Sequence, residues 1–109
     1  MSLRSTRITE IFISGPLTVR TCADYTCDIV SRLEHATAAA LDLSGCDDVD
    51  IAGVQLVEAA RRHAERRGVE LKLAAPAAGR WLEVLELGGF LRAAEPSDRA
   101  FWLHEAAAS

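Results

Sequence analysis

The chain has 109 residues, of which 50% are apolar and 26% are charged, and its formal net charge is −4. A chain of this length and composition can form one globular domain with a hydrophobic core. The acidic balance offers no basic face to phosphates, which disfavours nucleic-acid binding. No apolar run has the length of a membrane span and no signal peptide is visible, so we expect a cytoplasmic protein without direct membrane insertion.

The first structural pattern lies in residues 8–14, which are rich in β-branched and other apolar residues. These residues stop at the Gly-Pro pair of positions 15–16, which predicts a strand followed by a turn. Leu17 and Val19 alternate with polar residues and predict a second short strand, so the domain is expected to start with a hairpin. Residues 1–7 are expected to form a disordered leader.

A helix is predicted after Thr21, whose side chain suits an N-cap because its oxygen can accept a hydrogen bond from an exposed amide. The apolar face of this helix recurs at helical spacing and consists of Cys22, Thr26, Ile29 and Leu33. A short strand is predicted next, over residues 40–43, and it ends at Ser44 and Gly45.

The loop of residues 46–50 contains three aspartates and leads into a second helix, of about sixteen residues. This helix is predicted to start near Ile51 and to stop at Gly68, which suits a C′ position. Its inner face comprises Val54, Leu56, Val57, Ala60 and Ala64. Its outer face offers ion pairs three and four residues apart, among Glu58, Arg61, Arg62, Glu65 and Arg66.

Apolar and charged residues alternate over residues 69–73, which predicts a strand with one buried face. Pro76 suits the start of a third helix, which buries Trp81, Val84 and Leu85 and ends at the glycine pair of positions 88–89. Residues 101–104 are apolar enough for a closing strand or a helical turn. Residues 105–109 are expected to be a frayed tail, which leaves a single domain over residues 8–104.

The order of these elements predicts an α/β fold. Two strand–helix–strand units imply right-handed crossovers and parallel strands. The hairpin at the start adds an antiparallel neighbour, so we expect a mixed sheet of four or five strands. The strands lack the continuous apolar character of a sheet covered on both faces, so the helices are expected mainly on one face.

The most distinctive local pattern lies in residues 41–56. Residues 41–45 read Leu-Asp-Leu-Ser-Gly, and residues 50–56 read Asp-Ile-Ala-Gly-Val-Gln-Leu. The pattern resembles the STAS family, named after sulfate transporters and anti-sigma-factor antagonists, in which Asp-Leu-Ser-Gly, an acidic loop and Asp-Ser/Thr-x-Gly open a helix. Three more stretches agree in order, and the resemblance spans roughly Ile8 to Leu91: residues 15–18, 64–76 and 81–90.

The resemblance implies an anti-sigma-factor antagonist-like fold and a non-catalytic regulatory or adaptor module. Its partner-binding residues would be Asp47, Asp48, Asp50, Ile51, Ala52, Gly53 and Gln55. The implied partner is a protein: an anti-sigma-factor kinase, a chemotaxis-type signalling complex or the ATPase subunit of a transporter. The oligomeric state is left open. An alternative function is that of a small-ligand or nucleotide sensor, with its site near the same loop.

The chain departs from the family at the position of its regulatory phosphorylation. Ile51 stands where many members have the Ser or Thr that a kinase modifies, and Thr18 stands where many have an aspartate. Phosphorylation at the usual position is therefore not expected. A phosphorylatable antagonist that uses another hydroxyl, Thr18 or Ser44, is the remaining alternative. Ile51 itself either packs under the loop as a hydrophobic staple or anchors an interface.

Other chemistry has weaker support in the sequence. The aspartates at 47, 48 and 50 resemble a hard-cation site in composition, but their spacing fits no EF-hand loop. Asp50 also suits a helix N-cap, and Gly53 suits close packing of the first turn. The chain has no glycine-rich phosphate-binding motif and no nucleophile motif, and its three cysteines form no Cys-x-x-Cys pair. No catalytic residue, metal or cofactor is predicted.

Overall fold

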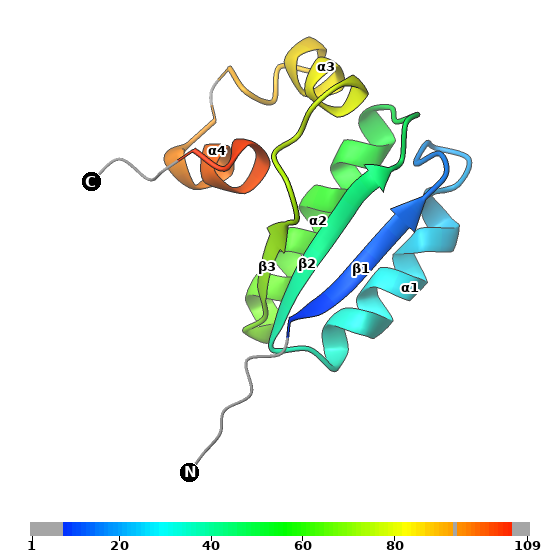
Figure 1. Cartoon of the computed structure of the whole chain (residues 1–109), viewed down its shortest axis with the longest axis vertical. Coiled ribbons are helices and arrows are strands. Elements are labelled where there is room, and N and C mark those ends of the chain that lie inside the picture. Colours follow the sequence, from blue (N-terminus) through cyan, green and yellow to red (C-terminus); the bar gives the residue numbers. More distant parts are fainter. Residues whose placement is uncertain (1–7, 93, 106–109) are drawn as a thin grey trace.

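The computed structural model describes residues 8–92 and 94–105. The predicted leader of residues 1–7 and the tail from residue 106 onward lie outside the described residues. The described elements alternate between strands and helices before the chain ends in two helices (Figure 1), in the order β1 (Thr9–Ser14), α1 (Cys22–Glu34), β2 (Ala38–Gly45), α2 (Ile51–Arg67), β3 (Glu70–Leu73), α3 (Arg80–Leu87) and α4 (Pro96–Leu103).

The sheet of the described residues has three strands in the order β1-β2-β3, and both pairs are parallel. The predicted α/β class is confirmed, whereas the predicted mixed sheet of four or five strands is wrong. Both crossovers step to the next strand in the same direction across the sheet. Because crossovers of this kind share one handedness, they place both helices on the same face of the sheet. Figure 1 shows α1 and α2 together behind the sheet, which confirms the predicted one-sided arrangement.

The core lies between the sheet and these two helices. On β1 the side chains of Ile11 and Ile13 are buried, whereas the intervening Phe12 is 57% exposed on the uncovered face. This alternation follows from the two-residue period of a strand. The helices supply apolar side chains at helical spacing, and the core includes Ile29, Leu33, Val54, Val57, Ala60 and Ala64. The predicted inner positions of α2 are thus confirmed, except that Leu56 is only partly buried.

The predicted hairpin is absent because the chain after β1 does not turn back. Gly15 takes a positive φ of 93°, and its N–H donates to the carbonyl of Gly45 at 3.0 Å. Leu17 then donates to the carbonyl of Asp48 at 2.9 Å and forms one isolated parallel bridge with Val49. Residues 15–19 therefore follow the loop after β2 and do not pair with β1.

The end of the described chain is helical. Glu95 and Asp98 form a capping box at the start of α4, and Pro96 occupies its first turn, where a missing N–H costs nothing. Of the two predicted alternatives for residues 101–104, the helical one is therefore correct. The predicted helix start at Pro76 is wrong, because Ala77 donates to the carbonyl of Trp102 at 2.8 Å and α3 begins only at Arg80.

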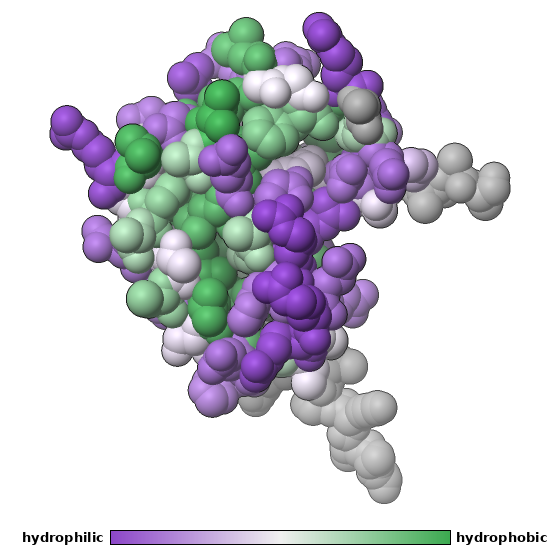
Figure 2. All heavy atoms as spheres, turned by 180° about the vertical axis from the view of Figure 1, so that it is seen from behind, coloured by the Kyte–Doolittle hydropathy of each residue, from purple (hydrophilic) through white to green (hydrophobic). Residues whose placement is uncertain are grey.

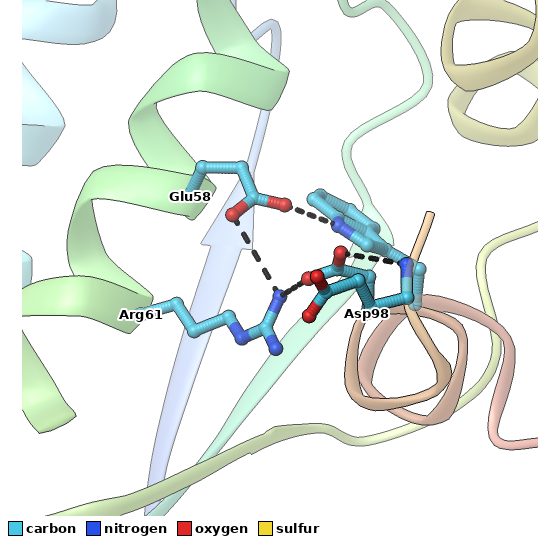
Figure 3. A network of polar contacts seen from close by, with 5 residues as sticks. Glu58, Arg61 and Asp98 are labelled. Carbon is cyan, nitrogen blue, oxygen red and sulfur yellow. Dashed lines mark hydrogen bonds and ion pairs between the residues drawn. The ribbon is translucent and has the colours of Figure 1, made fainter. Parts of the chain in front are cut away.

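A polar network fastens α4 to α2 (Figure 3). The indole Nε1 of Trp102 donates to Glu58 at 2.7 Å, and Arg61 pairs with Asp98 at 2.8 Å and with Glu58 at 3.7 Å. The hydrogen bond from Arg61 lowers the pKa of Asp98. The outer face of α2 was expected to form ion pairs within the helix, and the pair of Glu58 and Arg61 confirms one of them. The shorter ion pair of Arg61 connects α2 to α4.

Candidate functional site

Asp50 organises the start of α2. Its Oδ1 accepts a hydrogen bond from the backbone N–H of Gly53 at 3.2 Å, which makes it the N-cap of the helix, as predicted. Its Oδ2 accepts a second hydrogen bond from the backbone N–H of Val19 at 3.1 Å. One carboxylate thus joins the helix start to the loop of residues 15–21. Burial raises the pKa of the Cys22 thiol, and the negative charge of Asp50 raises it further.

Gly53 allows this loop to lie directly on the first turn of α2. A Cβ built on Gly53 would overlap the backbone oxygen of Leu17 and approach the Val49 side chain to 2.5 Å. Both Leu17 and Val49 are fully buried. The predicted role of Gly53 in close packing is therefore what the geometry requires.

Above this packed base, the surface exposes two apolar side chains. Ile51 is 48% exposed and Val19 is 74% exposed, and the hydrogen bond between Asp50 and Val19 brings their segments together. Asp47, Asp48 and Gln55 are exposed around them, and Ala52 is partly exposed. The predicted site residues thus divide into those that build the surface, Asp50 and Gly53, and those that are presented on it.

The two candidate hydroxyls have different surroundings. Thr18 belongs to the same loop: its backbone N–H donates to the side chain of Thr21 at 3.0 Å, and its own side chain is partly buried. Thr21 is the N-cap residue of α1 as predicted, but its side chain makes no capping bond to the helix, because it serves this loop. Ser44 lies at the end of β2, where its N–H bonds the Asp42 carboxylate at 2.9 Å.

Ser44 and Asp47 also line a separate cavity of about 380 Å³ between the end of β2 and the start of α3. Most of the other lining residues are apolar, among them Leu73, Pro76 and Trp81. The indole Nε1 of Trp81 donates to the carbonyl of Cys46 at 3.3 Å. This hydrogen bond connects α3 to the loop of residues 46–50. Burial raises the pKa of the Cys46 thiol, which keeps it protonated and unreactive at neutral pH.

Neither a metal cluster nor a membrane span occurs within residues 8–92 and 94–105. No three of the described His, Cys, Asp and Glu side chains come close enough to hold a metal ion. None of the described helices combines the length and the apolar character needed to cross a bilayer.

Two contributors to the site could not be identified from the sequence pattern. Val19 looked like part of a strand, and its exposure beside Ile51 depends on the loop that Asp50 holds. The bond from Trp81 to Cys46 joins residues 35 positions apart in the chain. The available signal was limited to the presence of a tryptophan, whose N–H needs a partner when it is buried.

Replacing Asp50 with alanine removes both hydrogen bonds of its carboxylate. We expect the free energy of unfolding to fall by about 1–2 kcal/mol, as for other lost N-caps with an additional bond. Asp50→Asn retains one side-chain oxygen and should fall between Asp50→Ala and the unmodified protein. Urea titration at neutral pH measures these differences, and an Asp50→Ala protein as stable as the unmodified one would contradict the capping role.

Comparisons with known proteins agree with the fold of this chain. A family model described as "Mlab, STAS domain" matches residues 2–93. A search of curated proteins gave no match. Among solved structures, the chain is similar to the anti-sigma-factor antagonist SpoIIAA in its unphosphorylated form, with 17% sequence identity, a TM-score of 0.57 and 80% of each chain covered. At this identity the likeness concerns the fold.

Proposed function

Since the chain belongs to the STAS domain family, we propose that it is a non-catalytic regulatory module that binds a partner protein in the cytoplasm. Its docking surface comprises Val19, Asp47, Asp48, Ile51 and Gln55 and is built on Asp50 and Gly53. The principal support is the exposure of two apolar side chains, Ile51 and Val19, on two segments that the Asp50 carboxylate joins by its hydrogen bonds. Partly exposed apolar side chains with a polar rim are typical of interface centres.

The charge of this surface suggests how it chooses a partner. Exposed carboxylates of Asp47 and Asp48 lie on the loop that leads into Ile51. Such rim charges steer association and select against acidic partners more than they add affinity. The partner is therefore expected to present a basic rim around an apolar pocket. An anti-sigma-factor kinase, a chemotaxis-type signalling complex and a transporter ATPase subunit are the candidate classes.

Regulation through a phosphate at the helix start has no support in this chain. Ile51 has no hydroxyl to modify. Thr18 is partly buried in the loop that Asp50 holds, and Ser44 lies at the end of β2, where it lines the separate cavity. We therefore propose constitutive binding, with control by partner availability.

Ile51→Glu tests the docking surface. We expect capture of the partner from a lysate of the native organism to be lost, because a carboxylate would replace the apolar centre of the interface, with affinity falling at least about tenfold. Leu87→Glu is the matched control, since Leu87 is 80% exposed on α3 and lies outside the surface. Mass spectrometry of the two captures and of the unmodified protein provides the comparison.

The same partner retained by all three proteins would contradict the docking role of Ile51. Circular dichroism and urea titration establish that both variants are folded. A helix-start residue that is 48% exposed tolerates this substitution with little loss of stability.

A second candidate function is that of a small-ligand sensor. The observation that favours it is the largely apolar cavity of about 380 Å³ beside Asp47, at the carboxyl ends of parallel strands, where α/β folds bind ligands. A melting temperature that rises with the concentration of a small apolar molecule distinguishes this function from docking, because binding to the folded state shifts unfolding by mass action.

A further inference from the structure

The outer faces of α1 and α2 leave an apolar groove between them. Figure 2, which shows the molecule from the side opposite to that of Figure 1, displays a band of apolar side chains bordered by a column of strongly polar ones. The groove contains a hollow of about 210 Å³ whose apolar lining includes Val30 of α1 and Leu56 and Ala59 of α2. An apolar cavity of about 150 Å³ accommodates benzene, so this hollow has room for one large apolar side chain.

One border of the groove is basic. His63 and Arg66 line the hollow. Arg62 follows Ala59 by three positions and lies beside the groove, where it also lines a separate pocket with Glu58 and Asp98. The acidic residues of α2, Glu58 and Glu65, lie further around the helix, where Glu58 is bonded to Trp102 and Arg61. Among the described residues, neither Arg62 nor Arg66 takes part in an ion pair.

His63 lines the same hollow, and its Nε2 is buried without a hydrogen-bond partner in the described part of the chain. Most buried polar atoms in native proteins have a hydrogen-bond partner. On α1, Asp28 is paired with Arg32 at 3.2 Å and Thr26 is neutral, whereas the exposed Glu34 follows Val30 by four positions. None of the described ion pairs gives Arg66 a carboxylate partner.

We propose that this groove receives an amphipathic helix of the partner protein, with one large apolar side chain in the hollow and carboxylates facing Arg62 and Arg66. The inference rests on the proposed function and names the recognition element of that partner. Two helices that lie side by side form a groove of the kind into which a third helix packs by its own apolar stripe. The groove adjoins the docking surface, because Gln55 and Ala59 follow Ile51 at steps of four residues along the same face of α2.

Charge argues against a second copy of this chain as the occupant. A two-fold interface brings the same patch of each subunit together, so the basic borders would face each other. An acidic helix gives the guanidinium groups of Arg62 and Arg66 carboxylate acceptors. The partner would therefore meet Asp47 and Asp48 with basic residues and this border with acidic ones.

The test is a selection from a displayed library of helical peptides of about 18 residues, or five turns, randomised at their exposed positions. We expect the selected peptides to carry Asp or Glu along one flank of an apolar stripe. Replacing those acids with Lys should weaken binding about tenfold in fluorescence anisotropy, since each exposed pair contributes up to about 1 kcal/mol. The double variant Arg62→Glu/Arg66→Glu should reverse this preference.

Two controls separate the groove from general surface effects. Ala59→Asp places a carboxylate at the hollow and should abolish binding of the selected peptides. Lys72→Glu/Arg92→Glu changes the net charge by the same amount as Arg62→Glu/Arg66→Glu, but at exposed residues outside the groove. This variant should leave binding unchanged. Amide NMR shifts on peptide addition should centre on the middle of α1 and α2.

Selected peptides without acidic bias, or binding that survives Ala59→Asp, would overturn the proposal. So would a concentration-dependent dimer, seen in sedimentation, that Ala59→Asp abolishes. Binding to anionic vesicles that requires Arg62 and Arg66 would also overturn it in favour of a lipid surface. A partner whose capture is lost with Ile51→Glu but retained with Ala59→Asp would overturn this inference and leave the proposed function standing.

Discussion

Trp102→Ala is expected to lower the free energy of unfolding by about 3–5 kcal/mol, as large truncations of buried aromatic residues do. The Trp102 side chain is 1% exposed, its ring centroid lies 6.0 Å from that of Trp81, and its N–H bonds Glu58. Removing the ring leaves a cavity between α3 and α4 and deprives the Glu58 Oε2 of its indole donor. A total stability of about 5–15 kcal/mol is typical of a domain, so the variant should be partly unfolded under mild conditions.

Urea titration followed by circular dichroism measures this loss. Trp102→Phe is the matched control, because it keeps an apolar ring and removes the donor to Glu58; a smaller loss of about 1–3 kcal/mol is expected from the orphaned acceptor. In the alanine variant Trp81 is the remaining tryptophan, so the fluorescence of the variant reports whether the Trp81 ring has become exposed to solvent. A loss below about 1 kcal/mol for Trp102→Ala would mean that α4 contributes little to the folded state.

Gly53→Ala should also destabilise the protein, although alanine is the better helix former by about 1 kcal/mol. The added methyl group would meet the backbone oxygen of Leu17 and the side chain of Val49, neither of which can move without disturbing the buried base of the site. Forced overpacking of this kind costs about 1–3 kcal/mol. The expected net result is a loss of up to about 2 kcal/mol. Partner capture should also weaken, because the loop that carries Val19 must shift.

Gly68→Ala is the matched control for Gly53→Ala. Gly68 ends α2 with a φ of 72°, and nothing lies within 4 Å of a Cβ placed there, so its cost is conformational alone, about 1 kcal/mol. Partner capture should be unaffected. If Gly53→Ala proves as stable as the unmodified protein, the loop of residues 15–19 is not packed on the helix as described.

The centre of the fold could be predicted from the sequence because its signals are local. The N-cap at Asp50, the C′ glycine at position 68 and the inner face of α2 all follow from residue type and spacing within one helix. The parallel order of the strands follows from the crossover units. The site residues came from resemblance to a family, and their spacing alone would not have indicated a function.

The errors, and the alternative left open for residues 101–104, concern segments whose structure depends on distant partners. Leu17 and Val19 alternate like a strand, but their backbone follows the loop after β2. Residues 101–104 are a short apolar run, and periodicity does not distinguish a buried strand from a helix at that length. The decisive local signal, the capping box of Glu95 and Asp98, was present in the sequence. The exposure of Ile51 required the tertiary structure, since a helix-start residue can face either way.

The position of α4 affects where the domain may be cut. The family model ends at residue 93, whereas the rings of Phe101 and Trp102 lie in the core and the carbonyl of Trp102 accepts from Ala77. An expression fragment that ended at that boundary, or a fusion joint placed there, would separate α4 from the domain. Trp81 would lose its packing against this helix, and Glu58 and Arg61 would lose their partners on it. A fusion partner joined after Glu105 would retain this C-terminal lock and the helix that presents the docking surface.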